Sequence, residues 1–327
     1  MTVLEVIQKS TEFLTKRGVD SPRLQAELLL AHVLKLPRMK LYLNFERTLS
    51  DPEANAMREF VKRRGVREPL QHILGSTSFC GFEIAVNRQV LVLRPETELL
   101  AELGWQFLST LNSQPSTALD FGTGSGCIAI ALAAKCPAAQ ITALDISTEA
   151  LALARQNAER NGVAGRIQFA AGDGFVAIPA ETRFDLIISN PPYIPAAEIE
   201  TLQPEVREFD PRAALAGGAD GLDFYRRLAA EAAVFLRPGG KIMAEFGDGQ
   251  AEEIKTIFET QMWIVEAVRE DYSQRQRSLI ARPGGKYKTA DELRSTQIPE
   301  GTAARSLEPS RPLNNQYYLR PSAFSCG

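Results

Sequence analysis

Hydrophobic residues follow a helical spacing in the first 75 residues of the chain. Val3, Ile7 and Leu14 form an apolar stripe along one helix face, and Ser21-Pro22 is typical of a helix start. The pattern predicts a small helical bundle in this region. No set of residues within it has the spacing of a catalytic site.

Residues 76–98 change to the alternating pattern of a β-hairpin. Apolar residues alternate with others, and Asn87-Arg88 favour a turn into the apolar run at 90–93. We therefore expect a hairpin that links the helical bundle to the rest of the chain. Residues 94–98 are typical of a helix start, because proline suits the first turn and acids favour the helix dipole.

Short apolar runs alternate with helical segments between residues 99 and 282. The runs lie at 117–121, 140–144, 166–170, 184–189 and 240–246. This alternation predicts an α/β fold, in which helices cover both faces of a mostly parallel sheet, with antiparallel edge strands near Trp263 and at 278–281. After Pro283 the periodicity stops, so residues 283–327 are expected to form a disordered tail.

Composition and charge exclude several classes of protein. Hydrophobic residues make up 44% and charged residues 24% of the chain, as in ordinary soluble globular proteins, and a net charge of −3 gives no general attraction to nucleic acid or membranes. The N-terminus has no apolar signal core, and no stretch reaches the roughly 20 apolar residues of a membrane span. The four cysteines and two histidines lack metal-ligand spacing. We expect a cytoplasmic, monomeric protein without a metal ion.

Charge is distributed unevenly along the chain. The first 75 residues carry 13 Lys and Arg against 9 Asp and Glu, an excess of four positive charges, so the remainder carries −7. A basic lobe would suit an acidic or RNA-containing partner, but a solvated helix face is the more common explanation of such an excess.

The apolar run at 184–189 leads into the sequence Asn190-Pro191-Pro192-Tyr193. The run is typical of a buried strand, and an Asn-Pro sequence is typical of a turn. Two prolines fix φ and carry no N–H, so the turn is stiff and its carbonyls are free to accept hydrogen bonds. Rigid acceptors beside an aromatic ring suit a planar amide or amine substrate.

A glycine-rich stretch separates the first of the apolar runs from a helical segment. It consists of Gly122, Thr123, Gly124, Ser125 and Gly126. Glycines let the backbone approach a ligand closely at a helix N-terminus. The dinucleotide fingerprint would need glycine where Cys127 stands, and the Gly-Lys-Ser/Thr of a phosphate-binding loop is absent. The loop therefore suits a ligand without a pyrophosphate.

Three aspartates end three successive predicted strands beside these glycines. Asp145 is placed for ribose hydroxyls, Asp173 for the exocyclic amine of adenine, and Asp120 for an ammonium group, directly or through water. Each alone is commonly a turn residue, but three at the carboxyl ends of strands indicate a ligand site. An adenosine that carries an amino-acid group and no phosphate is S-adenosylmethionine. Residues 116–282 resemble the Rossmann-like S-adenosylmethionine-dependent methyltransferases.

The Asn-Pro-Pro-Tyr motif is shared by methyltransferases that act on adenine N6 in nucleic acids and by those that act on glutamine in proteins. An amide nitrogen is a poor nucleophile because its lone pair is delocalised. The side-chain oxygen of Asn190 and the carbonyl of Pro191 would accept both N–H groups and align the nitrogen with the donor methyl, while Tyr193 would pack on the planar group. No strong base is needed before transfer, because the proton becomes acidic only afterwards.

Further stretches resemble the peptide chain release factor N(5)-glutamine methyltransferases (the HemK/PrmC family) over nearly all of residues 1–282. They are residues 67–75, 93–98, 189–194, 205–212 and 217–222, together with the glycine-rich stretch. The resemblance implies methylation of the glutamine in the Gly-Gly-Gln loop of class-I release factors, with S-adenosylmethionine as cofactor. It implies cofactor contacts by residues 122–126, Asp145, Gly174 and Asn190, and a glutamine site formed by Asn190, Pro191, Pro192 and Tyr193.

The resemblance also divides the chain. Residues 1–75 would recognise the substrate, residues 76–98 would form the linker, and residues 99–282 would carry out methyl transfer. Two positions depart from the family. Leu93 stands where proline is usual, and Gly174 stands where many members carry an aromatic residue over the adenine, so Phe175 or another ring would have to cover it.

Three alternatives remain open on the sequence. A ribosomal-protein glutamine methyltransferase shares the core motifs and differs in the N-terminal region. An adenine-N6 methyltransferase would need a strongly basic recognition surface, which a net charge of −3 does not support. A cofactor-binding scaffold without catalysis would have no use for the acceptor motif at 190–193.

Overall fold

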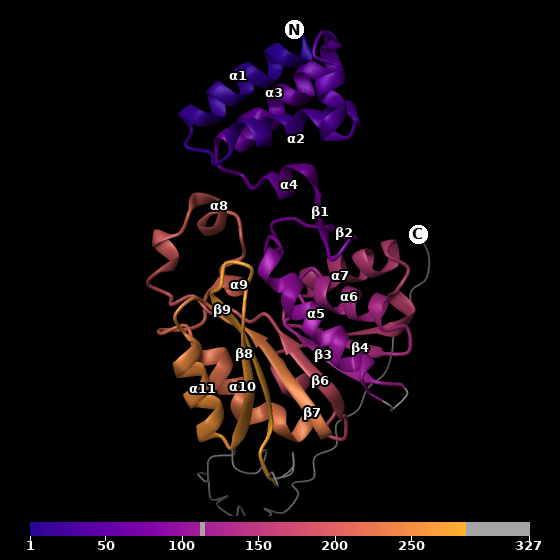
Figure 1. Cartoon of the computed structure of the whole chain (residues 1–327), viewed down its shortest axis with the longest axis vertical. Coiled ribbons are helices and arrows are strands. Elements are labelled where there is room, and N and C mark those ends of the chain that lie inside the picture. Colours follow the sequence, from indigo (N-terminus) through magenta and orange to yellow (C-terminus); the bar gives the residue numbers. More distant parts are fainter. Residues whose placement is uncertain (112–114, 286–327) are drawn as a thin grey trace, which may run out of the picture.

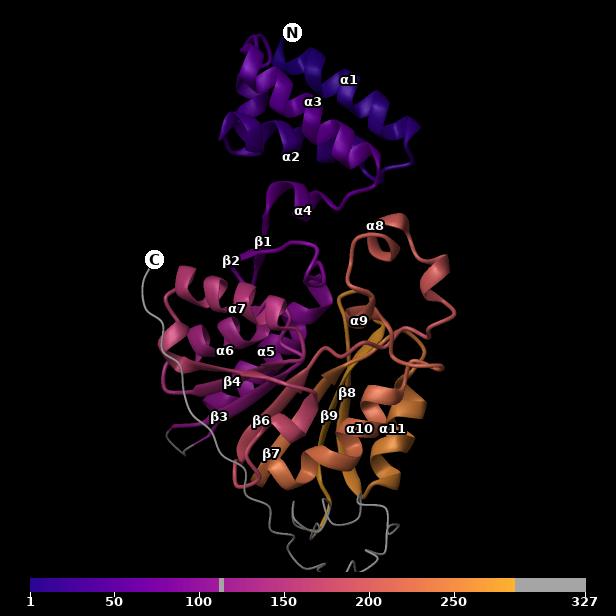
Figure 2. The same ribbon diagram turned by 180° about the vertical axis from the view of Figure 1, so that it is seen from behind.

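The computed structural model describes residues 1–111 and 115–285, so all but the first three residues of the expected tail lie outside the described residues. A group of helices stands apart from a larger α/β unit, and a short helix and a hairpin join the two (Figures 1 and 2). Within the described ranges, no helix is both long enough and apolar enough to cross a membrane.

The first 75 residues form the helical bundle that the hydrophobic spacing predicts. Its elements are α1 (Val3–Lys16), α2 (Pro22–Leu34), η1 (Arg38–Leu43), α3 (Asp51–Gly65) and α4 (Leu70–Leu74). Two of the helices begin with a capping box, in which Thr2 pairs with Glu5 and Ser50 pairs with Glu53. Ser21 precedes α2 as expected, but its side chain makes no capping hydrogen bond. Apolar side chains of α1, α2 and α3 form a core of their own.

The hairpin consists of β1 (Ser76–Phe79) and β2 (Phe82–Ala85), which pair antiparallel. Its turn is at Cys80 and Gly81, because both residues have positive φ, 51° and 85°, as a tight two-residue turn requires. The turn expected at Asn87-Arg88 is present, with the Val90 N–H donating to the Asn87 carbonyl at 3.3 Å, but it follows the hairpin instead of closing it.

The strand expected at residues 90–93 is wrong, because the described structure has no strand there. Val92 is buried, and its N–H donates to a carboxylate oxygen of Asp210 at 3.2 Å. A side chain more than a hundred residues away thus satisfies the backbone that a strand partner would otherwise satisfy. The helix start at residues 94–98 is confirmed, since α5 (Pro95–Ser109) begins at Pro95.

A seven-stranded sheet forms the centre of the α/β unit, with the order β5-β4-β3-β6-β7-β9-β8. The strands are β3 (Thr117–Phe121), β4 (Gln140–Asp145), β5 (Ile167–Ala171), β6 (Phe184–Ser189), β7 (Leu236–Glu245), β8 (Trp263–Glu270) and β9 (Gln276–Pro283). The strands β3 to β7 are parallel, and β9 is antiparallel to both of its neighbours. The mostly parallel Rossmann-like sheet is confirmed. Its reversed strand lies one place in from the edge, which β8 occupies.

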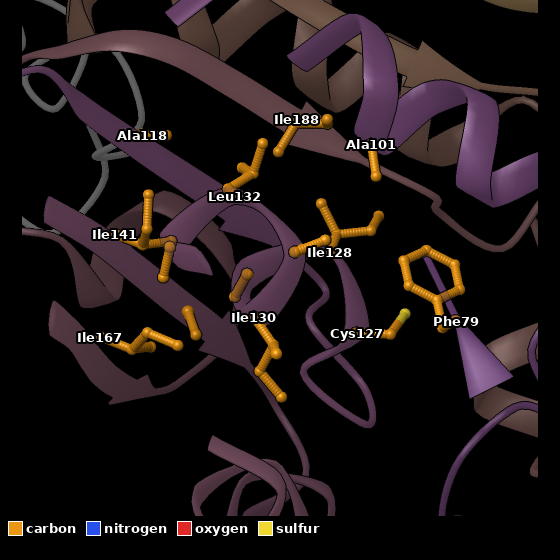
Figure 3. Packing of buried hydrophobic residues seen from close by; sticks show 14 of the residues in the cluster. Phe79, Ala101, Ala118, Cys127, Ile128, Ile130, Leu132, Ile141, Ile167 and Ile188 are labelled. Atoms are coloured by element: carbon orange, nitrogen blue, oxygen red, sulfur yellow. The ribbon is translucent and has the colours of Figure 1, made fainter. Parts of the chain in front are cut away.

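Helices cover both faces of this sheet (Figures 1 and 2). One face packs against α5, α6 (Cys127–Lys135) and α7 (Thr148–Arg160), and the other against α10 (Asp223–Glu231) and α11 (Ala251–Thr260). Successive strand residues alternate between the two cores, so that Ile188 faces α5 and α6 whereas Ile187 faces the opposite core. Figure 3 shows the first core, where Ile128 and Leu132 of α6 lie against Ile188.

The remaining elements are short. They are η2 (Ala164–Arg166), η3 (Gly174–Ala177), η4 (Ile199–Thr201), α8 (Pro204–Arg207), α9 (Arg212–Leu215) and η5 (Ala232–Phe235). The segment with η4, α8 and α9 leaves the sheet after β6 and extends toward the helical bundle (Figures 1 and 2).

Candidate active site

A cavity of about 400 Å³ opens at the carboxyl ends of β3, β4 and β6. Its wall combines the glycine-rich loop with Asp145, Asp173 and Asn190, so one cavity joins the predicted donor site to part of the predicted acceptor site. Ligands of open α/β sheets bind at this end of the strands. Many lining residues were not assigned to the site from the sequence, among them Gln89, Val90, Leu91, Leu93, Arg94, Thr97, Pro211, Ala213, Ala214, Phe224 and Arg227.

The glycine-rich loop has the backbone conformation that its glycines allow. Gly122, Gly124 and Gly126 have φ of 76°, 54° and 82°, in the left-handed region. A Cβ at Gly126 would also lie 3.0 Å from the Cβ of Ala154 in α7. The loop therefore packs closely on its support while its other two glycines leave open space for a ligand.

Asp145 holds this loop in place and lines the cavity. One carboxylate oxygen accepts from the N–H of Gly124 at 2.8 Å, and the other accepts from the N–H of Ser147 at 2.9 Å, just before α7. Each oxygen keeps a second lone pair, so the carboxylate can still accept from hydroxyl groups of a ligand.

Asp120 lies beneath the loop and is not among the residues that line the cavity. Its Oδ2 accepts from the Thr123 hydroxyl at 2.6 Å and from the Ala129 N–H at 3.1 Å. Its Oδ1 is buried and has no hydrogen-bond partner among the described residues. Burial raises the pKa of this carboxyl to about 7. A cation at the loop would stabilise its ionised form, which fits a ligand with an ammonium group.

Phe175 was one of the rings expected to cover an adenine, but it does not line the cavity. Phe175 is buried, with its ring 4.9 Å from those of Phe121 and Phe235 in the core. A Cβ at Gly174 would collide with the guanidinium of Arg227. Phe224 lines the cavity and is the ring, apart from Phe121, that the described structure offers there.

Arg227 also occupies one side of Asp173. Its guanidinium donates to the Asp173 carboxylate and, at 2.7 Å, to the Asp173 carbonyl. This ion pair fixes the aspartate at the cavity wall and leaves its second carboxylate oxygen for a ligand amine.

Asn190 is half-buried at the end of β6 and lines the cavity. Its side-chain amide donates to the Thr97 hydroxyl at 3.0 Å. The preceding Ser189 donates to the Phe121 carbonyl at 2.7 Å, which ties the ends of β6 and β3 together. The acceptor motif and the donor loop are thus held side by side.

Only one of the other three residues of the acceptor motif reaches the cavity. Pro192 lines the cavity, whereas Pro191 and Tyr193 are not among its lining residues. The Tyr193 carbonyl accepts from the side chain of Gln250 at 2.9 Å, and burial raises the pKa of its phenol to about 12. The structure therefore brings Asn190 and Pro192 directly to the cavity and places Tyr193 as a half-buried support of the same turn.

A second glycine segment supports the acceptor turn from behind. Gly217 donates to the Ile194 carbonyl at 2.9 Å, and Ile194 donates to the Leu215 carbonyl at 3.0 Å. A Cβ at Gly217 would lie 2.8 Å from the Pro192 carbonyl oxygen. Only glycine lets the two segments approach so closely.

Six of the cavity residues that sequence reasoning missed lie in 89–97. Thr97 is buried and contacts Asn190, and Arg94 forms an ion pair with Asp210 at 3.1 Å. Burial raises the pKa of Asp210 to about 6. The stretches 93–98 and 205–212 both resemble the family, but their local pattern does not indicate that they meet in space.

Comparisons with known proteins agree with this geometry. Residues 5–75 match a family model described as the PrmC N-terminal domain, and residues 104–204 match one described as the methyltransferase small domain. A release factor glutamine methyltransferase of Geobacter sulfurreducens is 47% identical over 259 residues, which cover 79% of this chain and 88% of the relative. One of Chlorobaculum tepidum is 42% identical over 284 residues, which cover 85% and 96%. The chain belongs to the family of release factor glutamine methyltransferases.

Proposed function

We propose that the protein transfers a methyl group from S-adenosylmethionine to the side-chain amide nitrogen of the glutamine in the Gly-Gly-Gln loop of class-I peptide chain release factors. The observation that carries this proposal is the single cavity that contains both the glycine-rich loop and Asn190. Membership in the family supports the choice of a protein glutamine as acceptor.

The donor half of the cavity fits S-adenosylmethionine. Residues 122–126 would lie against its amino-acid portion, Asp145 would accept from the ribose hydroxyls, and Asp173 would accept from the adenine amine. The buried Oδ1 of Asp120 suits the charge of the ammonium group, directly or through water. When bound, S-adenosylmethionine supplies an electrophilic methyl group on a sulfonium.

The acceptor half would hold the glutamine amide. The Asn190 amide oxygen and the Pro191 carbonyl would accept its two N–H groups, which aligns the nitrogen and stabilises the positive charge that develops during transfer. Neither histidine of the chain lines the cavity. This agrees with a mechanism in which the proton leaves only after the methyl group has been transferred.

The remaining assignments belong to the same proposal. Residues 1–75 would recognise the body of the release factor. Residues 76–98 would link this region to residues 99–282, which would catalyse methyl transfer. The protein would act as a monomer in the cytoplasm, without direct contact to nucleic acid.

Mass spectrometry after incubation with isotopically labelled S-adenosylmethionine tests the proposal. The purified protein is offered release factors, ribosomal proteins and adenine-containing DNA and RNA in separate reactions. Label on the glutamine of Gly-Gly-Gln is the expected result. Label on a ribosomal-protein glutamine or on adenine N6 would replace the proposal by the corresponding alternative, and absence of label from every substrate would refute methyl transfer to them.

A further inference from the structure

The amide of Asn190 has a defined orientation in this structure. Its Nδ2 donates to the Thr97 hydroxyl at 3.0 Å, and no hydrogen bond to its Oδ1 is found within residues 1–111 and 115–285. The side-chain oxygen is therefore the end of the amide that is left for a substrate. This matters because an oxygen accepts from a substrate N–H, whereas an amino group in the same place would oppose it.

The orientation depends on the hydroxyl of Thr97, which is itself buried. A hydroxyl carries one hydrogen, and its oxygen can accept from Asn190 while that hydrogen is donated elsewhere. The carboxyl of Glu245 lies where it can accept this hydrogen, and its interaction with the Thr97 side chain lowers the pKa of the carboxyl.

Glu245 lies at the end of β7, beside β6. The register pairs Ser189 with Ala244, so Glu245 and Asn190 follow directly on the paired residues of the two strands. Glu245 is only 2% exposed, and its Oε2 has no hydrogen-bond partner among the described residues. A buried acid with one oxygen unpaired is costly to fold, and nothing in the acceptor motif itself explains its presence.

We propose that Thr97 and Glu245 are positioning residues that orient the Asn190 amide, so that its oxygen faces the glutamine nitrogen to be methylated. This inference rests on the function proposed above and adds two residues to it. The ionised carboxylate can only accept, so it takes the Thr97 hydrogen. The Thr97 oxygen must then accept from the Asn190 amino group, which leaves the amide oxygen toward the cavity.

Protonation of Glu245 would remove this constraint. The pKa of Glu245 is raised to about 7, chiefly by burial and in part by Glu96, although Thr97, Arg277 and Arg94 act to lower it. The phenols of Tyr193 and Tyr225 also face this carboxyl. A protonated carboxyl can donate to Thr97, and the Thr97 hydrogen can then turn toward Asn190. The productive arrangement is therefore present above the pKa of Glu245 and is lost as the pH falls through about 7.

Kinetics on a purified class-I release factor test this inference. Thr97→Val keeps the shape of the side chain and removes the hydroxyl, so kcat should fall about tenfold or more, while the Kd for S-adenosylmethionine measured by calorimetry changes little. Thr97→Ser restores the hydroxyl and should recover most of kcat. Thr256→Val, on the exposed face of α11, is the matched control.

The pH profile separates positioning from a structural role. Wild-type kcat at saturating substrates should decrease below about pH 7, and Glu245→Gln should have a low kcat that no longer varies across this range. Glu253→Gln, exposed on α11, should retain the wild-type profile. If Glu245→Gln does not fold, Thr97→Val replaces it in this test, and its kcat should likewise no longer vary with pH across this range.

Two outcomes would overturn the inference: wild-type kcat in Thr97→Val, or an unchanged pH profile in the folded variants. Failure of the proposed function would look different, because the wild-type protein itself would then transfer no methyl group to the factor at any pH.

Discussion

Arg67 and Glu205 form a two-point ion pair across 138 residues of sequence. Nε and Nη2 of Arg67 donate to the two carboxylate oxygens of Glu205, each at 2.6 Å. Arg64, only 4% exposed, donates to the same carboxylate at 2.6 Å. One side chain of α8 thus binds the end of the helical bundle to the segment that follows the acceptor motif. The bundle is thus in direct contact with the segment that follows the acceptor motif.

Replacement of Glu205 by Gln should weaken this connection. Arg64 would lose its anionic partner while remaining buried, so the free energy of unfolding should fall by roughly 1–3 kcal/mol, less than for a fully buried pair because Glu205 keeps some solvent contact. Urea denaturation measures this loss. Glu200→Gln removes the exposed pair with Arg212 and should change stability by less than about 0.5 kcal/mol.

The same variant tests the role of the bundle in recognition. We expect kcat/KM on a whole release factor to fall several-fold, because the bundle would no longer be held against the substrate, while kcat/KM on a short Gly-Gly-Gln peptide stays near wild type. Equal losses on factor and peptide would refute a recognition role for residues 1–75.

Substitutions in the glycine-rich loop should differ according to their neighbours. Gly122 and Gly126 both have positive φ. The Cβ added by Gly126→Ala would lie 3.0 Å from the Cβ of Ala154, whereas the Cβ added by Gly122→Ala would have no atom within 4 Å. The positive φ alone costs about 1–2 kcal/mol, so Gly126→Ala should lose more stability than Gly122→Ala in the ligand-free protein. Thermal and urea unfolding of both variants compare the two, and equal losses would show that packing on α7 does not matter.

Local sequence predicts much of the sheet and the part of the site that lies at the ends of its strands. Residues such as Asp145 and Asn190 end apolar runs, and parallel strands bring their carboxyl ends to one edge. That two such residues meet in one cavity can therefore be predicted without knowledge of long-range contacts. The close backbone approach expected of the glycine-rich loop agrees with its three glycines at positive φ, a region that glycine adopts without steric cost.

The parts that were predicted incorrectly depend on distant partners. Residues 90–93 have the composition of a strand, but Asp210 takes up the Val92 N–H and the segment becomes a cavity wall instead. Of the rings that could cover an adenine, Phe175 fills the core instead, where Phe235 stacks on it. No local pattern indicates either choice, because each is decided by packing between segments far apart in the chain.

Phe224 is expected to cover the adenine that Phe175 cannot reach. Stacking of a base on an aromatic ring contributes about 1–3 kcal/mol, so Phe224→Ala should weaken binding of S-adenosylmethionine about tenfold or more without a comparable loss of kcat at saturation. Phe175→Leu should instead lower the unfolding free energy and leave the affinity of the folded protein near wild type. Calorimetry and denaturation on both variants distinguish the roles, and wild-type affinity in Phe224→Ala would exclude the stacking contact.

Asn190→Ala should separate methyl transfer from cofactor binding. The side chain lines the cavity and contributes to the acceptor half, so its loss removes alignment of the glutamine nitrogen, and transfer should become undetectable in a tritiated-methyl assay. The Kd for S-adenosylmethionine should stay within about tenfold of wild type, because the glycine-rich loop, Asp145 and Asp173 remain. Asn55→Ala, in the exposed part of α3, serves as the control for amide removal. Normal turnover in Asn190→Ala would contradict the assigned role, and loss of cofactor binding together with activity would place the side chain in the donor half instead.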